Sequence, residues 1–259
     1  MKNTMYNDIT IVMPVRIDCQ DRISNLRTVL SWIDLMNYPI LLLEADKEPH
    51  CSEFQTKYAN VTYHYIEDHD TVFHRTKYIN QLINMASTPV VAVWDADIIV
   101  PIEQIQQASR LIVENGCTIA YPYDGRYIML SSEMSDGFRR EMNLQPITEQ
   151  ELKPIYKMPF CGGIFLISKK QYLEIGGENE KFVGWGPEDA ERLRRCQITG
   201  HKAQWIKEGR AYHLFHKRNI EEQEIDNENL ILMRKEFVKI CSMEKDELLD
   251  YIRASSTFK

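Results

Sequence analysis

Short apolar runs alternate with amphipathic helical patterns along the N-terminal part of the chain. Apolar side chains recur at helical spacing in two segments, Arg22–Trp32 and Thr76–Met85. Apolar runs flank these segments and predict strands at residues 9–13, 40–43, 61–66 and 90–94. Proline has no backbone N–H to donate, so Pro14 is expected to end the first strand. Strands alternating with helices predict an α/β fold with a mostly parallel sheet flanked by helices.

The pattern changes in the second half of the chain. Residues 124–158 are rich in Ser, Glu, Met and Arg and show little periodicity, so we expect an irregular, substrate-facing excursion there. The apolar run Ile164–Ile167 predicts another strand, and Pro187–Ile198 predicts a helix. Residues 221–240 and 245–252 predict two C-terminal helices, the first with an apolar stripe that suits the core or a partner contact. The stripe is made of Leu230, Met233, Phe237 and Ile240.

Length and composition narrow the class of protein. A chain of 259 residues accommodates one α/β domain with a small appendage, which we expect to be residues 1–218 and a C-terminal helical extension over 219–259, packed on or beside it. The contents of 44% hydrophobic and 27% charged residues indicate a soluble globular protein. The net charge of -7 argues against nucleic acid as a partner, because neutralising phosphates requires clustered Lys and Arg.

The cysteines and the apolar runs indicate the cellular compartment in which we expect the protein. The six cysteines are scattered without a C-x-x-C pair, so we interpret them as reduced thiols. The polar start of the chain leads directly into a strand pattern without a signal peptide. No apolar run approaches the roughly 18–20 residues needed to span a bilayer. We therefore expect a cytoplasmic protein.

Two carboxylates follow the apolar run Val90–Trp94. Asp95 and Asp97 lie at the end of a buried strand, and open α/β sheets bind ligands at that edge. Carboxylates two residues apart can converge on one Mg²⁺ or Mn²⁺ ion, which typically bridges to a substrate phosphate. Taken alone, an Asp-x-Asp favours a helix N-cap and a solvated turn over a metal site.

Two further motifs carry candidate chemistry. In Gly184-Trp185-Gly186-Pro187-Glu188-Asp189, the acids suit a helix start, but an aromatic ring between glycines and beside two carboxylates is typical of a carbohydrate site. The second motif, His213-Leu214-Phe215-His216, places two imidazoles on one face of a turn. Together with Asp97, these histidines would leave positions for two diphosphate oxygens on a six-coordinate Mn²⁺.

Five segments, in this order, resemble those of the β-1,4-galactosyltransferases and their relatives. The resemblance covers about residues 9 to 218, and its order is more specific than any single motif. Pro14-Val15-Arg16-Ile17-Asp18 corresponds to the family motif P-F-R-N-R, and Val72–Lys77 with Asn80 corresponds to F-N-R-A-K-L-L-N. Asp95-Ala96-Asp97 corresponds to D-V-D, and Cys161-Gly162-Gly163 with Ser168-Lys169-Lys170 corresponds to F-G-G with a downstream S-K-x-Q. Gly184–Asp189 corresponds to G-W-G-G-E-D. His213 and His216 stand where the family has a Met and a His that complete the metal site.

The resemblance implies a GT-A (Rossmann-like) fold and a role for each matching residue. Asp97, His213 and His216 would hold Mn²⁺, with Mg²⁺ as the alternative, Asp189 would be the catalytic base, and Glu188 would bind donor or acceptor hydroxyls. The implied donor-binding residues are Pro14, Val15, Arg16, Asp18, Glu44, Asp46, Phe73, Arg75, Asp95, Ala96, Trp185 and Gly186. The implied sugar and acceptor pocket comprises Phe160, Gly162, Gly163 and Pro187.

The chain departs from the family pattern at three of these positions. Asp18 replaces the second arginine of the nucleotide loop, Pro187 replaces a glycine, and His213 replaces the metal-binding Met. The sequence also shows no counterpart of the membrane anchor of the animal enzymes, and we expect the protein to lack one. We therefore expect a bacterial enzyme acting on a polysaccharide or lipid-linked glycan at the inner face of the membrane, with peripheral membrane contact through its acceptor.

The resulting hypothesis is an inverting, metal-dependent transferase that moves a hexose, galactose or an N-acetylhexosamine, from a UDP-sugar to a glycan or lipid-linked saccharide. Three alternatives stay open at this stage. A retaining or polymerising enzyme would use the same fold, and a non-catalytic nucleotide-sugar or carbohydrate-binding module would have no need of Asp189. A metal-dependent phosphohydrolase would use the Asp-x-Asp as nucleophile, but the chain shows no matching Lys and Thr/Ser set.

Overall fold

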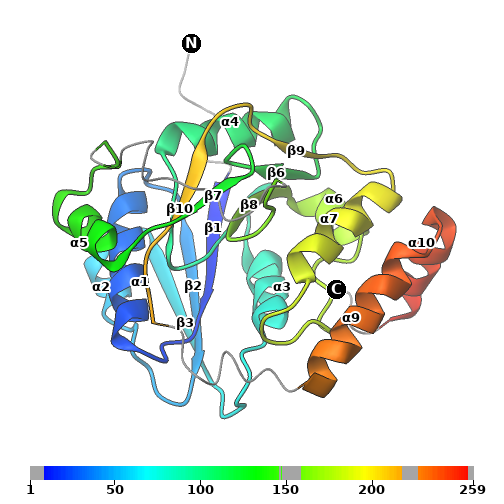
Figure 1. The fold of residues 1–259 in the computed structure, drawn as a ribbon, viewed down its shortest axis with the longest axis horizontal. Helices are drawn as coiled ribbons and strands as arrows, with labels where there is room; N and C mark the ends of the chain where they lie inside the picture. The colour runs from blue at the N-terminus through cyan, green and yellow to red at the C-terminus, as the bar shows by residue number, and fades with distance from the viewer. Residues whose placement is uncertain (1–8, 146, 148–158, 218–226, 256–259) are drawn as a thin grey trace.

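The computed structural model describes residues 9–145, 147, 159–217 and 227–255. Its centre is a seven-stranded sheet in the order β3-β2-β1-β4-β8-β6-β9 (Figure 1). The pairs among β3, β2, β1 and β4 are parallel, β8 runs antiparallel to β4 and β6, and β9 runs parallel to β6. The predicted α/β fold with a mostly parallel sheet is therefore confirmed, and it agrees with the GT-A architecture.

The elements follow the order expected for crossover connections. The first half contains β1 (Ile9–Val15), α1 (Gln20–Asp34), β2 (Ile40–Asp46), α2 (Phe54–Lys57), β3 (Val61–Glu67), α3 (Arg75–Met85), β4 (Val90–Trp94), β5 (Ile98–Ile99), α4 (Ile102–Val113) and β6 (Ile119–Tyr121). The second half contains β7 (Arg126–Met129), α5 (Ser132–Glu141), β8 (Ile164–Ser168), α6 (Lys169–Glu174), α7 (Glu188–Ile198), β9 (Ala203–Trp205), β10 (Arg210–His213), α9 (Asn227–Cys241) and α10 (Lys245–Ala254).

Two expectations about the elements were wrong. The first strand continues through Pro14 to Val15, because β1 pairs with β4 only as far as Val12 and with β2 beyond it. Pro14 therefore needs no ladder partner on the β4 side. The segment expected to be irregular contains β7 and α5, and α5 begins with an N-cap in which Ser131 Oγ accepts a hydrogen bond from Met134 N at 3.1 Å. Residues 146 and 148–158 of that segment lie outside the described residues.

A second, three-stranded sheet connects distant parts of the chain. Its order is β5-β10-β7, with β10 antiparallel to β5 and parallel to β7. Strand β5 follows Asp97 directly, and its residue Ile98 is paired with His213. The backbone N–H of Leu214 also donates to the carbonyl of Asp97 at 2.8 Å. This pairing brings the histidine motif to the end of β4.

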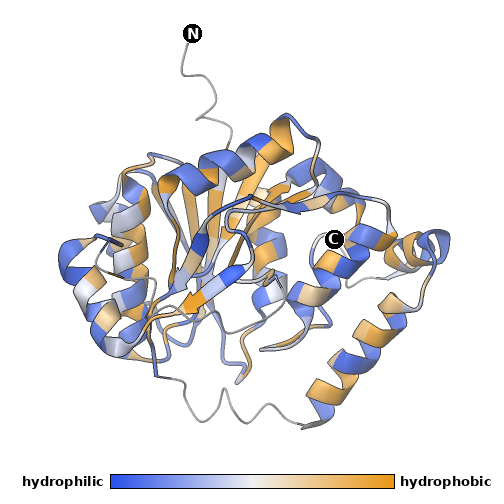
Figure 2. Ribbon diagram, turned by 45° about the horizontal axis from the view of Figure 1, so that its top comes forward, coloured by the Kyte–Doolittle hydropathy of each residue, from blue (hydrophilic) through white to orange (hydrophobic). Residues whose placement is uncertain are grey.

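The apolar side chains of the sheet form one continuous core. Strands β1, β4 and β8 are almost completely buried, and hydrophobic ribbon colours concentrate on the strands, while the covering helices alternate between hydrophobic and hydrophilic (Figure 2). Near-continuous apolar strands are expected where helices cover both faces of a sheet. All six cysteines lie in the described ranges, and none forms a disulfide.

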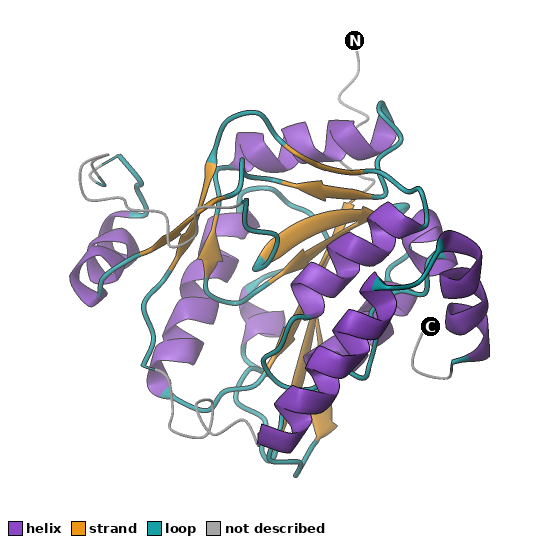
Figure 3. Cartoon of the chain, turned by 45° about the vertical axis from the view of Figure 1, so that its right-hand side comes forward, coloured by secondary structure: helices purple, strands orange, loops and turns teal. Residues whose placement is uncertain are grey.

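The C-terminal helices pack beside α7, at the outer edge of the molecule (Figures 1 and 3). Ile240 of α9 and Leu248 of α10 form a small buried cluster, against which Ile198 of α7 packs. Met233 of α9 is also buried, and its Sδ lies next to Gly186. Of the predicted stripe, Met233 and Ile240 are thus buried against the rest of the fold. None of the helices that the structure describes combines the length and the apolar character needed to span a bilayer.

Candidate active site

Asp97 and two histidines form a compact cluster at the end of β4. Asp97 Oδ2 lies 3.5 Å from Nε2 of His213 and 3.5 Å from Nε2 of His216, and one ligand atom from each residue lies within 4.8 Å of the other two. Burial acts to raise the pKa of Asp97, but the charges of His213, Arg22 and His216 outweigh it and lower the pKa. Two imidazoles and one carboxylate are a donor set that suits Mn²⁺ and neighbouring transition metals. The predicted metal-binding residues therefore fit one cation.

A second group with metal-ligand chemistry lies at the end of β2. The side chains of Glu44, Asp46 and His50 also approach within 4.8 Å. Both oxygens of Glu44 are already used, because they accept from the backbone N–H groups of His50 at 2.8 Å and Cys51 at 3.0 Å and from the Tyr63 hydroxyl at 2.5 Å. Glu44 is fully buried and holds the loop after β2. The structure therefore gives the predicted donor-binding Glu44 a bonding role within the fold.

The loop after β1, which the sequence predicts to bind the nucleotide, is tied to the ends of β2 and β3. Arg16 donates to the carbonyl of Ala45 at 2.9 Å and to Asp68 Oδ2 at 2.7 Å, and its guanidinium lies 5.3 Å from the Phe73 ring centroid. Asp46 Oδ2 accepts from Ile17 N at 2.9 Å. These contacts bring the predicted donor-binding residues of three segments together. The remaining members of the predicted donor set in this area are Pro14 and Val15 on β1 and Ala96 in the turn after β4.

Arg22 is a charged group of this site that the sequence analysis missed. Its Nη1 lies 3.7 Å from Asp97 Oδ2, and its Nε donates to Asp18 Oδ1 at 2.9 Å. Asp18 and Arg22 are four residues apart at the start of α1, a spacing at which side chains meet. The guanidinium of Arg22 therefore brings positive charge from α1 to Asp97, although Asp18 replaces the arginine of the family pattern. The (i, i+4) spacing of Asp18 and Arg22 is the feature of the sequence from which this contact could have been predicted.

Arg75 binds Asp95 and also interacts electrostatically with the two acids at the start of α7, Glu188 and Asp189. It donates to Asp95 Oδ1 through Nη2 at 2.5 Å and through Nε at 3.1 Å. Its third nitrogen, Nη1, is buried and has no hydrogen-bond partner among the described residues. Burial raises the pKa of Asp95, and the neighbouring Arg75 offsets this only in part. The negative charges of Asp95, Asp189 and Glu188 all act on Arg75 and raise its pKa against the opposing effect of burial.

Asp189 is held by a buried arginine that sequence patterns did not reveal. Arg192, one helical turn later, donates to Asp189 Oδ1 at 2.8 Å and to Glu178 Oε1 at 2.8 Å. Its guanidinium also lies 3.9 Å from the centroid of the Phe165 ring. The other oxygen, Asp189 Oδ2, lies against Gly162, where a Cβ atom would come within 2.2 Å of it. The glycine thus provides the space that the carboxylate occupies.

Glu188 is a buried acid beside Asp189. Its exposed fraction is 7%, and Oε2 accepts a hydrogen bond from Gly186 N at 3.0 Å. Burial, followed by the charge of Asp189, raises the pKa of Glu188 to about 8. Pro187 precedes α7 instead of opening it, because the helix begins at Glu188. The two acids therefore lie in the first turn of α7 in different environments.

The glycine-flanked Trp185 lies close to the start of α3. Gly184 has φ of +69°, a conformation that favours glycine, and its N–H donates to the carbonyl of Phe73 at 3.2 Å. Trp185 is 66% exposed. A Cβ atom on Gly186 would come within 2.8 Å of Met233 Sδ of α9. The motif therefore presents an aromatic ring to solvent between α3, α7 and α9.

The predicted sugar pocket lies beside Gly162. The Phe160 ring lies 4.3 Å from that of Tyr127, and the carbonyl of Phe160 accepts from Trp205 Nε1 at 2.8 Å. Gly163 has φ of +77°, and a Cβ atom there would come within 3.0 Å of Tyr127. Phe160 and Asp189 therefore both lie next to Gly162, and Gly163 lies against Tyr127.

Part of the chain is similar in sequence to known galactosyltransferases. Residues 147–217 match a family model described as the N-terminal domain of galactosyltransferase. A segment of 79 residues is 35% identical to β-1,4-galactosyltransferase 7 of Mus musculus and of Homo sapiens. This segment covers 30% of this chain and 24% of each relative, so the chain spans about a quarter of the curated relatives it matches. The resemblance to β-1,4-galactosyltransferases is thus confirmed over that part of the chain.

Proposed function

We propose that the chain is an inverting, metal-dependent glycosyltransferase that moves a hexose from a UDP-sugar to an acceptor hydroxyl. One observation carries this proposal: Asp97, His213 and His216 form one cluster, and the charge of Arg75 acts both on Asp97 of that cluster and on the separate carboxylate of Asp189. A cation-binding group and a separate carboxylate, linked by an arginine, are what transfer from a diphosphate donor requires. We further propose that residues 1–218 form the transferase domain and 219–259 an extension.

Asp97, His213 and His216 would hold Mn²⁺ or Mg²⁺ in this scheme. The bound cation would supply neutralisation of the charge that develops on the departing diphosphate. Arg22 and Arg75 would add positive charge around it, because both guanidinium groups reach the Asp-x-Asp turn. The buried Nη1 of Arg75 has no hydrogen-bond acceptor within the described residues. An unsatisfied buried N–H group supports a role for Arg75 in binding the UDP-sugar.

Asp189 is our candidate for the base. Its Oδ1 is bound by Arg192, which fixes the direction of the carboxylate and leaves Oδ2 facing Gly162. A proton leaving the acceptor hydroxyl would move to that oxygen. Glu188, whose pKa is raised to about 8, would then bind sugar hydroxyls as a neutral or charged acid according to pH.

The donor preference is proposed from the wall around Phe160. In the resembling family, the residue at this position faces the 2-substituent of the sugar. A phenylalanine retains the bulk of a tyrosine but offers no hydroxyl, so we propose UDP-galactose over UDP-N-acetylgalactosamine by about 1–2 kcal/mol. Phe160→Leu should improve the use of the N-acetylated donor. A wild-type preference for N-acetylated donors would contradict this assignment.

The second candidate function is a non-catalytic binding module for nucleotide-sugars or carbohydrates. The exposed Trp185 beside two carboxylates favours carbohydrate binding whether or not transfer follows. The well-fixed Asp189 favours catalysis, because binding alone does not require a carboxylate held by a buried arginine.

Asp189→Asn separates these two functions. The substitution keeps the shape of the side chain and removes the base, so Mn²⁺-dependent UDP release in the presence of acceptor should fall about 10²–10⁴-fold. Binding of UDP-sugar, measured by thermal shift, should persist. Asp250→Asn, on the exposed surface of α10, is the matched control. Absence of acceptor-stimulated UDP release from the wild-type protein would favour the binding module.

A further inference from the structure

One face of α9 exposes aliphatic side chains to solvent. Ile231, Leu232 and Val238 are 49%, 60% and 65% exposed, and they are three of the eight large hydrophobic side chains exposed in the described residues. The ribbon of α9 shows hydrophobic and hydrophilic bands at the outer edge of the molecule (Figure 2). Single exposed apolar side chains are ordinary, but three on one face of a helix indicate an interaction surface.

The same face carries positive charge. Arg234, Lys235 and Lys239 are exposed, and the described residues place no carboxylate in an ion pair with Arg234 or Lys235. Of the acids on this helix, Glu236 is buried and paired with Lys181 at 3.2 Å. Glu228 is exposed but lies at the start of the helix. This face is therefore locally basic in a chain whose net charge is -7.

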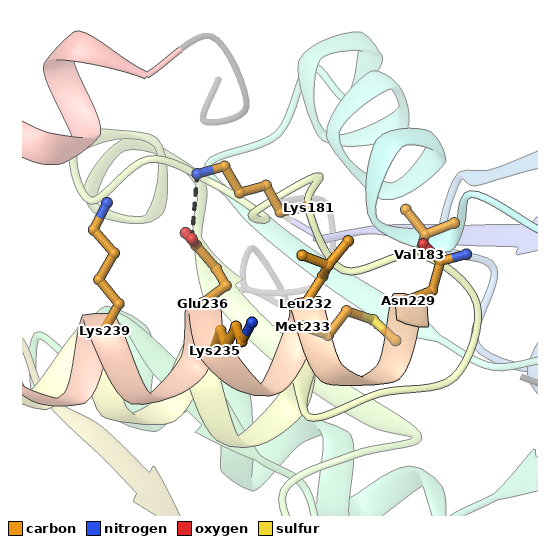
Figure 4. A pocket seen from close by; sticks show the side chains of 8 residues that line it. All are labelled: Lys181, Val183, Asn229, Leu232, Met233, Lys235, Glu236 and Lys239. Atoms are coloured by element: carbon orange, nitrogen blue, oxygen red, sulfur yellow. Dashed lines mark hydrogen bonds and ion pairs between the residues drawn. The ribbon is translucent and has the colours of Figure 1, made fainter. Parts of the chain in front are cut away.

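A hollow of about 430 Å³ continues this surface toward the body of the protein. It lies between α9 and the segment that precedes the Trp185 motif, and Figure 4 shows its lining. Its lining combines Val183, Leu232 and Met233 with three lysines and two further polar residues, Lys181, Lys235, Lys239, Asn229 and Glu236. Lys181 is paired with Glu236 in this lining, so the cations left for a ligand are Lys235 and Lys239. Aliphatic side chains beside these two ammonium groups match a ligand that combines acyl chains with anionic head groups.

We propose that this face of α9 binds an anionic lipid surface. The basic aliphatic face is defined by Ile231, Leu232, Arg234, Lys235, Val238 and Lys239. Helices that lie in a membrane interface bury aliphatic side chains among the acyl chains, and Lys and Arg extend to the lipid phosphates. A second copy of the chain fits less well, because a two-fold contact would bring the three cations of both copies into one interface.

The location of this face relates it to the candidate active site. On the inner side of α9, Met233 packs against Gly186, next to Trp185 and two residues before Glu188. Seating α9 on a membrane would therefore hold the acceptor side of the site close to the lipid head groups. If the proposed transferase function holds, its acceptor is a saccharide linked to lipid; membrane binding by α9 does not depend on that function.

Vesicle co-sedimentation of the full chain, without donor or metal, tests the membrane proposal. The protein should bind phosphatidylcholine vesicles that contain phosphatidylglycerol, should bind pure phosphatidylcholine weakly, and should dissociate at high salt. Arg234→Gln combined with Lys235→Gln should weaken binding about 30-fold, because each basic residue near an anionic surface contributes about fivefold. Leu232→Ser combined with Val238→Ser should weaken it at least about tenfold.

A matched control uses an exposed apolar and an exposed basic residue elsewhere. Leu35→Ser combined with Lys170→Gln should bind vesicles like the wild type. All variants should keep the wild-type Tm and its shift with UDP and Mn²⁺, which separates loss of membrane binding from failure of the proposed function. The proposal is overturned if anionic and neutral vesicles bind equally, if the α9 variants bind as the wild type does, or if these variants only dissociate a dimer in size-exclusion chromatography.

Discussion

Replacing Gly162 by alanine would test how the fold positions the candidate base. A Cβ atom at this position would come within 2.2 Å of Asp189 Oδ2, within 3.0 Å of its Cγ and within 2.9 Å of Phe160 Cζ. Gly162 is not among the residues with positive φ, so its backbone conformation is open to alanine. The effect of the substitution would therefore come from crowding and not from backbone strain.

The crowding has to move the carboxylate. Ordinary van der Waals contacts begin at 3.4 Å, and the contact of 2.2 Å therefore requires a displacement of more than 1 Å. Asp189 is anchored to Arg192 at 2.8 Å, so the movement would strain that ion pair. A misplacement of about 1 Å costs roughly 10²-fold in rate. Overpacking of this kind also destabilises a core by about 1–3 kcal/mol, or a fall in Tm of a few degrees.

The assay compares acceptor-dependent UDP release by Gly162→Ala and by a control glycine. Gly137 lies within α5, and the nearest atom to a Cβ there is Arg140 Nη2 at 3.9 Å. Gly137→Ala should therefore keep its activity and gain up to about 1 kcal/mol of stability from helix propensity. Binding of UDP with Mn²⁺ should be retained by both variants, since neither side chain belongs to the cation cluster.

The result that refutes this reasoning is a Gly162→Ala variant with wild-type turnover. Such a variant would mean that the Asp189 carboxylate can move without consequence, and that it is not the proton acceptor. A variant that loses UDP binding together with turnover would instead place Gly162 in the donor site.

Three further predictions address the metal, the buried acid and the arginine. His216→Ala should weaken UDP binding in the presence of Mn²⁺ by more than the roughly 10–100-fold loss typical of a residue that only orients a metal ligand. The Tm of the metal-free protein should be unchanged. Equal UDP binding by variant and wild type would contradict the metal assignment. The pKa of Glu188 is raised from 4.5 to about 8, so its ionisation lowers the stability of the folded state progressively as pH rises between these values. Glu188→Gln should therefore raise Tm more at pH 9 than at pH 5. A Tm difference independent of pH would show that Glu188 keeps an ordinary pKa. Arg75→Lys keeps the charge but loses the planar fork toward Asp95, so the donor KM should rise about tenfold or more, and unchanged kinetics would remove Arg75 from the donor site.

Local patterns in the sequence predicted most of the long strands and helices, although not the helix α4. The apolar runs predicted β1 to β4 and β8, and the helical spacing predicted α1, α3, α7 and the two C-terminal helices, because side-chain periodicity reflects which face of an element is buried. Residue type also identified candidate ligands, since few side chains other than carboxylates and imidazoles bind such cations. The short elements β5, β7 and β10 were missed because each has too few residues to show a period.

The tertiary structure decided which of these residues act together. Pairing of β10 with β5 brings His213 and His216 to Asp97, and no spacing along the chain encodes that contact. The fold also turns Glu44 inward to hold its own loop. The sequence determined the elements and the chemical groups, because both depend on neighbouring residues. Which carboxylate binds a ligand and which one stabilises the fold depends on the hydrogen-bond donors that distant segments bring to it, and only the packed structure specifies those donors.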